Sequence, residues 1–202
     1  KSIFSQQNVL TTAQQFREHA PHTYVLCYIL EAYGVWRKRA SAWLGQFDSQ
    51  AFRRGTQDAT MFARFEAAED ELERLPIIVN QGDLRDVREI VTDARAVLTD
   101  KRRFPDVDRI GLIVIDHAQR VGGPGDMVEK YEEIGLQLEA LSNELQCPII
   151  LPSQVTIKDG QPVSKWSRAI EENASLVIYL KRGDDGASEE QLQFAKHGRL
   201  VC

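Results

Sequence analysis

Short apolar runs alternate with longer amphipathic stretches along most of the chain, and this alternation constrains the fold more than any other feature. Residues 23–30, 76–79, 110–115 and 148–151 carry apolar side chains at nearly every position, as do strands buried on both faces of a parallel sheet. Between these runs, apolar residues recur every three to four positions, as in amphipathic helices. The pattern predicts an α/β fold with a mostly parallel sheet flanked by helices.

The amphipathic stretches predict where the helices lie. They are expected at residues 5–20, 35–44, 58–75, 83–98 and 127–145. Residues 155–165 are polar and contain Gly160 and Pro162, which predicts a loop. Two more strands are expected at 176–180 and 192–195, around the turn-rich residues 183–186. Because no internal repeat or linker divides the chain, we expect a single domain over residues 1–202.

The composition excludes several classes of protein. The chain has 43% hydrophobic and 27% charged residues, which is typical of a globular domain. Its apolar runs are far shorter than the roughly 20 residues of a membrane-spanning helix. Three cysteines without a CxxC pair argue against a disulfide framework or a zinc ribbon, and predict a cytoplasmic protein. A net charge of −5 confines any DNA contact to a local basic region.

Polar side chains follow the expected strands, where ligands of open α/β sheets bind. Asp116 could there hold the water shell of a Mg²⁺ ion bound to nucleotide phosphates. Glu31 could activate an attacking water, or it could be an acidic residue at the start of the next helix. Gln154, after Ser153, could contact a γ-phosphate or bond to a loop. The sequence therefore indicates a candidate site at this edge of the sheet.

Cations and a possible phosphate contact complete the candidate residues. Lys196 and Arg199 follow the last expected strand and could neutralise phosphate charge or lie solvated on the surface. The chain opens with Lys1 and Ser2 ahead of a helix, as at the end of a phosphate-binding GxxxxGK[ST] loop. By themselves these two residues carry little information, because the glycines of that motif do not precede them in the sequence.

Four segments occur in an order and at intervals that are typical of one family. They are Ile29-Leu30-Glu31-Ala32, Ile115-Asp116-His117-Ala118-Gln119, Ser153-Gln154-Val155 and Ile170-Glu171-Glu172-Asn173-Ala174-Ser175. These segments resemble the Ser-Leu-Glu-Met, Ile-Asp-Tyr-Leu-Gln, Ser-Gln-Leu and Ile-Glu-Gln-Asp-Ala-Asp stretches of the DnaB-like replicative helicases, whose motor domain is RecA-like. The resemblance covers almost the whole chain, and its last segment is the most specific.

The resemblance implies an ATP-driven hexameric ring that translocates on single-stranded DNA and binds nucleotide between neighbouring subunits. Lys1 and Ser2 would contact the β- and γ-phosphates and Mg²⁺, and Asp116 would hold the Mg²⁺ site. Glu31 would activate the attacking water, and Gln154 would report the γ-phosphate to the DNA-binding loops. The family also implies a primase or a helicase loader as a partner, and a bacterial cytoplasm as the setting, with the protein perhaps phage- or plasmid-encoded.

Two further features of the family concern charged residues. Family members insert a Lys-x-Arg pair into the neighbouring subunit's site, whereas Lys196 and Arg199 are three positions apart here, so either of them could act in trans. The loops after Asp116 and Gln154 face the central channel in this family. Arg120 in the first loop, and Lys158 and Lys165 in the second, are therefore the expected DNA contacts, with ordinary flexible connections as the alternative.

The phosphate-binding loop of a RecA-like sheet normally follows a central strand, and no strand precedes Lys1 in this sequence. Its removal would leave two facing rows of unpaired backbone groups. We therefore expect a RecA-like sheet without its first strand, in a segment of a longer protein. Two alternatives stay open: a RecA/RadA-like recombinase or circadian-clock-type RecA ATPase, and a non-catalytic nucleotide-binding ring or loader protein. Residues 170–180 favour the helicase.

Overall fold

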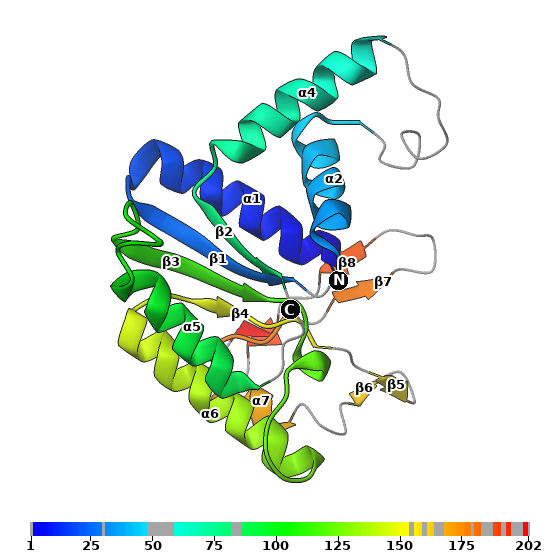
Figure 1. The fold of residues 1–202 in the computed structure, drawn as a ribbon. Helices are drawn as coiled ribbons and strands as arrows, with labels where there is room; N and C mark the ends of the chain where they lie inside the picture. The colour runs from blue at the N-terminus through cyan, green and yellow to red at the C-terminus, as the bar shows by residue number, and fades with distance from the viewer. Residues whose placement is uncertain are drawn as a thin grey trace.

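The computed structural model describes residues 2–29, 31–47, 59–81, 86–153, 156–158, 161–163, 168–178, 180–182, 188–190, 193–194 and 200–201. Helices and strands alternate along most of this chain, as the sequence predicts (Figure 1). The helices are α1 (Ser2–His19), α2 (Tyr33–Leu44), α4 (Ala59–Glu73), α5 (Val87–Thr99), η1 (Ala118–Arg120), α6 (Met127–Leu145) and α7 (Arg168–Asn173). The main sheet contains β1 (Thr23–Ile29), β2 (Ile77–Gln81), β3 (Arg109–Ile115) and β4 (Ile149–Ile150).

The main sheet is parallel and its strands pair in the order β2-β1-β3-β4. We expected a gap in the middle of the sheet where a phosphate-loop strand would belong. That expectation is wrong for the strands that the structure describes, because each of these strands pairs with the next without interruption. The two facing rows of unpaired backbone groups therefore do not arise, and the open edges of this sheet belong to β2 and β4.

The helices cover both faces of the sheet, which explains the continuous apolar runs. Val25, Cys27 and Ile29 of β1 pack beneath α1, α2 and α4. Leu26 and Tyr28 point to the other face and pack against α5 and α6. All of these β1 side chains are almost fully buried. A strand with this burial cannot alternate apolar and polar residues, because each side chain meets a helix.

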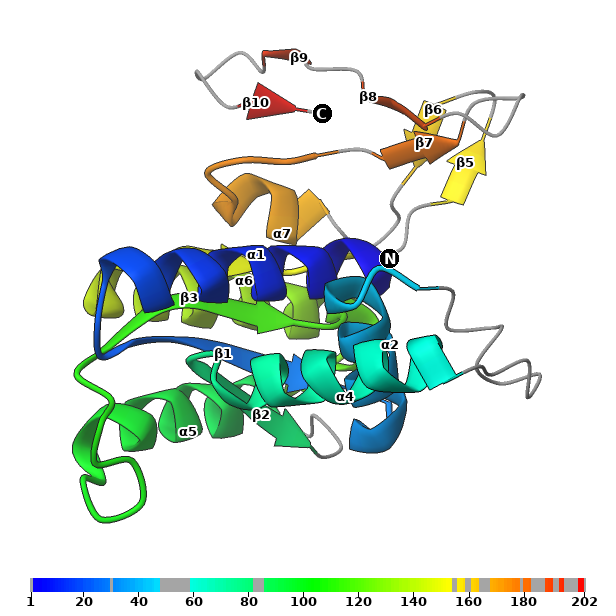
Figure 2. The ribbon, with the colours of Figure 1, turned by 90° about the horizontal axis from the view of Figure 1, so that it is seen from above.

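Helix α1 lies close against β3. A Cβ atom at Gly111 would stand 2.4 Å from the ring of Phe16 and 2.7 Å from the methyl carbon of Thr23. Glycine at this position in β3 therefore allows the helix to approach the strand, while a larger residue would push the Phe16 ring aside. Because α1 precedes β1 through a short turn, the two run in opposite directions, and the N-terminal end of α1 lies at the carboxyl edge of the sheet (Figure 2).

The second half of the chain differs from the prediction in two places. Residues 155–165 were expected to form a loop, but β5 (Thr156–Lys158) and β6 (Gln161–Val163) pair as an antiparallel hairpin. Pro162 is compatible with this pairing because a proline without a backbone N–H is tolerated at an edge position. The strand expected at 176–180 begins later, since β7 (Leu180–Arg182) pairs with β8 (Ser188–Glu190). A last pair joins β9 (Gln193–Phe194) to β10 (Leu200–Val201).

Side chains fix the start of helix α6. The Asp126 carboxylate accepts hydrogen bonds from the backbone N–H groups of Val128 and Glu129, at 2.8 and 3.0 Å, and the Glu129 carboxylate accepts one from the Asp126 N–H. This reciprocal capping box satisfies backbone donors that the helix itself cannot pair. Gly125 precedes the cap with a φ of +74°, a conformation that favours glycine.

We expect Asp126→Ala to lower the free energy of unfolding by about 1 kcal/mol, because the backbone donors at the start of α6 lose their acceptor. Urea denaturation followed by circular dichroism measures this change. Asp126→Asn is the matched control, since the amide oxygen still accepts these hydrogen bonds and most of the stability should remain. Equal stability of Asp126→Ala and the unsubstituted protein would show that the cap does not hold this helix end.

None of the helices in the described ranges has the length and apolar character that crossing a bilayer requires.

Candidate active site

The two carboxylates predicted from the sequence lie at the ends of neighbouring parallel strands. Glu31 follows β1 and Asp116 directly follows β3, and these strands pair side by side. The backbone N–H of Asp116 donates a 3.0 Å hydrogen bond to the carbonyl oxygen of Tyr28. This bond extends the ladder by one residue, so that Asp116 is held beside the end of β1. The structure thus brings together the two acidic residues that the sequence singled out.

The segment after β3 is also joined to the end of β4. The backbone N–H of Ala118 donates to the carbonyl oxygen of Pro152 at 2.9 Å. The side-chain amide of Gln119 donates to the hydroxyl of Ser153 at 2.8 Å. The residues after β3 therefore bridge the strands on both sides, and Ser153 takes the place at this edge that its sequence position predicted. The neighbouring Gln154 lies outside the described residues.

Asp116 has a buried oxygen that suits a cation. Its side chain is 14% exposed, and Oδ1 accepts no hydrogen bond from any part of the chain that the structure describes. The ring Nδ1 of His117 lies 3.9 Å from this oxygen, beyond hydrogen-bond distance. A buried carboxylate oxygen without a donor is costly, so a positive charge or a water held by one is the natural complement here.

Glu31 is half-buried and its carboxylate forms an ion pair with the guanidinium of Arg39 in α2. Burial raises the pKa of Glu31 above its ordinary value. The Arg39 charge opposes this rise in pKa, while the nearby Asp116 carboxylate adds to it. The net effect on the pKa is upward, which makes Glu31 a stronger base than a solvated glutamate. The influence of Asp116 on this pKa also shows that the two carboxylates are close enough to interact.

Arg39 is a residue of this site that the sequence did not reveal. It lies in the middle of α2, among other cations, and its contact with Glu31 depends on how α2 packs over the end of β1. Its Nε also donates to the side-chain oxygen of Gln6 in α1 at 3.3 Å. The only signal in the sequence was a cation on the helix that follows Glu31, and such cations are common on solvated helix faces.

The arrangement matches one known family. The model of the "DnaB-like helicase C terminal domain" matches residues 9–199. The chain belongs to this family. It is 30% identical over 152 residues to the replicative DNA helicase DnaB of Geobacillus stearothermophilus, an alignment that covers 69% of this chain and 32% of the relative. The chain thus spans about a third of the length of that curated helicase.

Two solved structures share the fold of this DnaB-like domain. An ATPase domain superposes with a TM-score of 0.74 and 19% identity, over 100% of this chain and 80% of that one. A DnaB-like replicative helicase, studied with its interactions with primase, gives a TM-score of 0.69 at 19% identity, over 95% of this chain and 53% of that one. These likenesses confirm the RecA-like α/β architecture that the sequence led us to expect.

The other predicted site residues are placed in part. Ser2 is the first residue of α1, whose N-terminal end lies beside the beginning of α2 at the carboxyl edge of the sheet (Figure 1). Lys1 and Gln154 fall outside the described residues, as do Lys196 and Arg199. The structure therefore brings Glu31, Asp116 and the backbone of Ser2 to one edge, and leaves the remaining phosphate contacts as predictions.

The predicted DNA-binding residues lie on the segments after β3 and β4. Arg120 is exposed in η1. The loop that follows was expected to be mobile, but its start is anchored, because Val121 is fully buried and the carbonyl oxygen of Gly122 accepts a 3.1 Å hydrogen bond from the Val87 N–H. The backbone of Lys158 belongs to β5. Lys165 lies outside the described residues.

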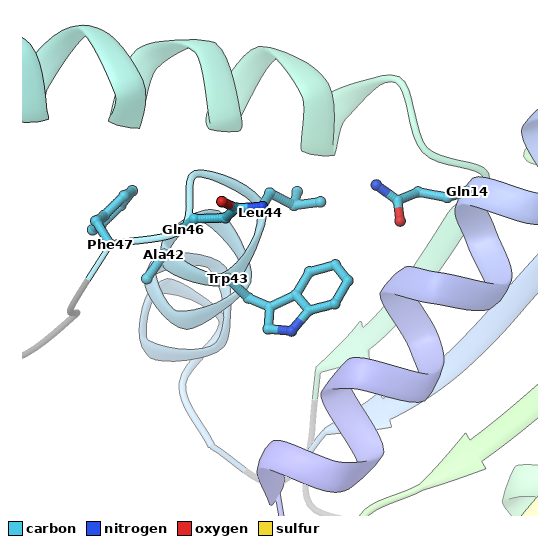
Figure 3. A pocket seen from close by; sticks show the side chains of 6 residues that line it. All are labelled: Gln14, Ala42, Trp43, Leu44, Gln46 and Phe47. Carbon is cyan, nitrogen blue, oxygen red and sulfur yellow. The ribbon is translucent and has the colours of Figure 1, made fainter.

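A separate hollow lies away from the carboxylates. It has a volume of about 580 Å³ and is lined by Gln14, Ala42, Trp43, Leu44, Gln46 and Phe47. Figure 3 shows Trp43 and Leu44 extending from the end of α2 toward the side of α1 that carries Gln14. This is the end of α2 farther from Glu31. The largest hollow near α2 is therefore distinct from the edge where the acidic residues meet.

Proposed function

We propose that this chain is the ATPase motor domain of a ring-shaped replicative helicase, which hydrolyses ATP between subunits and uses the energy to translocate on single-stranded DNA. The observation that carries this proposal is the pair of carboxylates, Glu31 and Asp116, at the ends of adjacent parallel strands. It is supported by the match to the DnaB-like family over residues 9–199. That match favours the helicase over the recombinase and circadian-clock alternatives.

The two carboxylates have different environments and so different proposed roles. Asp116 carries the buried oxygen without a donor and is proposed to hold a water bound to Mg²⁺. Glu31, with its raised pKa, is proposed to accept the proton of the attacking water. The described residues contain no group of three or more His, Cys, Asp or Glu that could hold a metal by itself. This suits Mg²⁺, which when bound with one or two carboxylates and phosphates neutralises phosphate charge.

The phosphates themselves are proposed to lie at the start of α1. A helix N-terminus presents backbone N–H groups and a partial positive charge to an anion. Ser2 begins this helix, and it is proposed to contact Mg²⁺ and the phosphates together with Lys1. Gln154, one residue after Ser153 at the end of β4, is proposed to sense the γ-phosphate. Lys196 or Arg199 is proposed to reach the site of the neighbouring subunit.

The proposed polymer substrate is single-stranded DNA in the centre of a hexameric ring. Arg120, Lys158 and Lys165 are the proposed contacts to its phosphates, because they stand on the segments that continue from the two strand ends carrying Asp116 and Gln154. One structural relative was solved with its interactions with primase. We propose a primase or a helicase loader as a partner of this protein as well.

ATP hydrolysis by the full-length protein, with and without single-stranded DNA, tests the proposed function. A helicase motor should hydrolyse ATP faster when DNA is present and should displace a strand from a forked duplex. The second candidate is a ring that binds nucleotide without hydrolysing it. The spacing of Lys196 and Arg199, which departs from the Lys-x-Arg pair of the family, favours that candidate. Nucleotide binding without turnover would support it.

We expect Asp116→Asn to raise the Mg²⁺ concentration needed for half-maximal hydrolysis about 10- to 100-fold, because the neutral amide orients metal-bound water less strongly. A titration of Mg²⁺ at saturating ATP measures this change. Asp126→Asn, at the cap of α6 in the same connecting segment, is the matched control and should leave the Mg²⁺ dependence unaltered. An unaltered Mg²⁺ dependence in Asp116→Asn would remove this residue from the metal site.

A further inference from the structure

The position of the Glu31 carboxylate is not fixed by the strand that precedes it. Strand β1 ends at Ile29, and Glu31 stands beyond it, before α2 begins at Tyr33. A side chain at such a position has several rotamers open to it unless other groups hold it. The interaction that holds this carboxylate is the ion pair between Oε1 of Glu31 and the guanidinium of Arg39.

Arg39 is itself held by a buried amide. Its Nε donates to the Oε1 atom of Gln6 at 3.3 Å, and the Nε2 atom of Gln6 donates to the backbone carbonyl of Trp36 at 2.8 Å. Gln6 is only 5% exposed, so both ends of its amide are used in a place where unpaired polar groups are costly. The guanidinium therefore has a defined place between α1 and the end of β1.

The neighbouring Arg37 shows that this is not a general property of cations on α2. Residues two positions apart on a helix point to different sides, because each residue turns the helix by about 100°. Arg37 pairs with Glu69 and Glu73 of α4 and fastens the two helices together. Arg39 instead pairs with the proposed base and with α1. The two arginines thus have separate tasks, one between helices and one at the site.

The geometry of the Arg39 pair suits a base that must remain free to accept a proton. The ion pair engages Oε1 of Glu31, which leaves Oε2 to face a water. The side chains of Arg39 and Glu31 are 29% and 26% exposed, so the pair is screened less than one on the open surface. Gln6 lies one turn after Ser2, and so the same contacts connect the base to the helix whose N-terminus is proposed to hold phosphate.

From these contacts we infer that Arg39 is a positioning residue, which orients the Glu31 carboxylate toward the attacking water and ties it, through Gln6, to the helix at the phosphate site. The inference rests on the proposed role of Glu31 as the base. It adds a residue that acts through Glu31 without touching the nucleotide.

Steady-state ATP hydrolysis by the full-length protein tests this inference through three variants. Arg39→Gln should lower kcat about 10- to 100-fold with KM for ATP within about twofold, because a misplaced base slows the chemical step without changing nucleotide binding. Arg39→Lys should recover part of kcat, since an ammonium keeps the charge but cannot bridge Glu31 and Gln6 as a guanidinium does. Arg37→Gln, the matched control, should lower the melting temperature and leave kcat unchanged.

A double-variant cycle separates positioning from simple damage. In a Glu31→Gln background, Arg39→Gln should cause no further loss of kcat, because Arg39 acts only through the carboxylate. An unchanged or increased kcat in Arg39→Gln, or an equal loss of kcat in Arg37→Gln, would overturn the inference. If Arg39→Gln does not fold, Arg39→Lys decides, and an unchanged kcat there also overturns it. Full activity of Glu31→Gln would instead contradict the proposed function itself.

Discussion

Glu31→Gln in the full-length protein is expected to lower ATP turnover about 10²- to 10⁴-fold while leaving ATP binding intact. The glutamine keeps the size and shape of the side chain, and it can still accept a hydrogen bond from Arg39. It cannot accept the proton of the attacking water. The rate of phosphate release measures turnover, and a fluorescent ATP analogue measures nucleotide affinity in the same preparation.

Glu69→Gln is the matched control for this experiment. Glu69 is also a half-buried glutamate paired with an arginine of α2, namely Arg37, but it lies in α4 and outside the candidate site. The same chemical change there should affect the packing of α2 on α4 and leave turnover near that of the unsubstituted protein. Unchanged hydrolysis in Glu31→Gln would remove Glu31 from the role of base.

Replacing both Lys196 and Arg199 with alanine is expected to lower hydrolysis by the assembled ring, by a factor as large as the ~10³ to 10⁵ that trans-acting cations contribute in phosphoryl transfer. Such subunits should regain activity when mixed with Glu31→Gln subunits. At equal amounts, about a quarter of the interfaces would combine an intact base with an intact cation of the next subunit. Single substitutions then show which of the two cations acts.

A second mixture provides the control for complementation. Glu31 and Asp116 belong to one edge of one sheet, so mixing Glu31→Gln subunits with Asp116→Asn subunits should restore no complete site. Recovery in this mixture would mean that the two carboxylates serve different sites. Full activity of the doubly substituted Lys196 and Arg199 variant, or an equal defect in its monomers, would contradict an inter-subunit site.

The central strands and the longest helix were predictable because their burial leaves a strong pattern. Strands were expected at 23–30 and 110–115 and are found at Thr23–Ile29 and Arg109–Ile115. The helix expected at 127–145 has those bounds in the structure. Burial on both faces requires a continuous apolar run in a strand, and burial on one face requires the three-to-four repeat in a helix.

Short elements and pairings between strands were not predictable in the same way. The β5 and β6 strands have three residues each, too few to show a period, and Gly160 and Pro162 are local signals of a loop. Their pairing supplies the order that the local sequence does not indicate. The unbroken order of the main sheet likewise depends on tertiary contacts between distant segments, which is why the expected gap was wrong.

The candidate site divides along the same line. Glu31 and Asp116 could be found because each follows an apolar strand, and parallel strands bring their ends to one edge. Arg39 could not be found, because its partner is set by the packing of α2 rather than by its place in the sequence. Gln6 was equally hidden, since nothing in its neighbourhood distinguishes it from other glutamines on α1.

The backbone bonds after β3 also have a consequence for how rigid this edge is. Strand ends usually fray, yet the amide hydrogens of Asp116 and Ala118 are donated to carbonyls of the two flanking segments, at Tyr28 and Pro152. Deuterium should therefore replace these two hydrogens slowly, as in the interior of a sheet. An edge stitched on both sides keeps its acidic groups in place before any ligand arrives, so the entropy of ordering them is lost once, during folding, and is not lost again at each turnover.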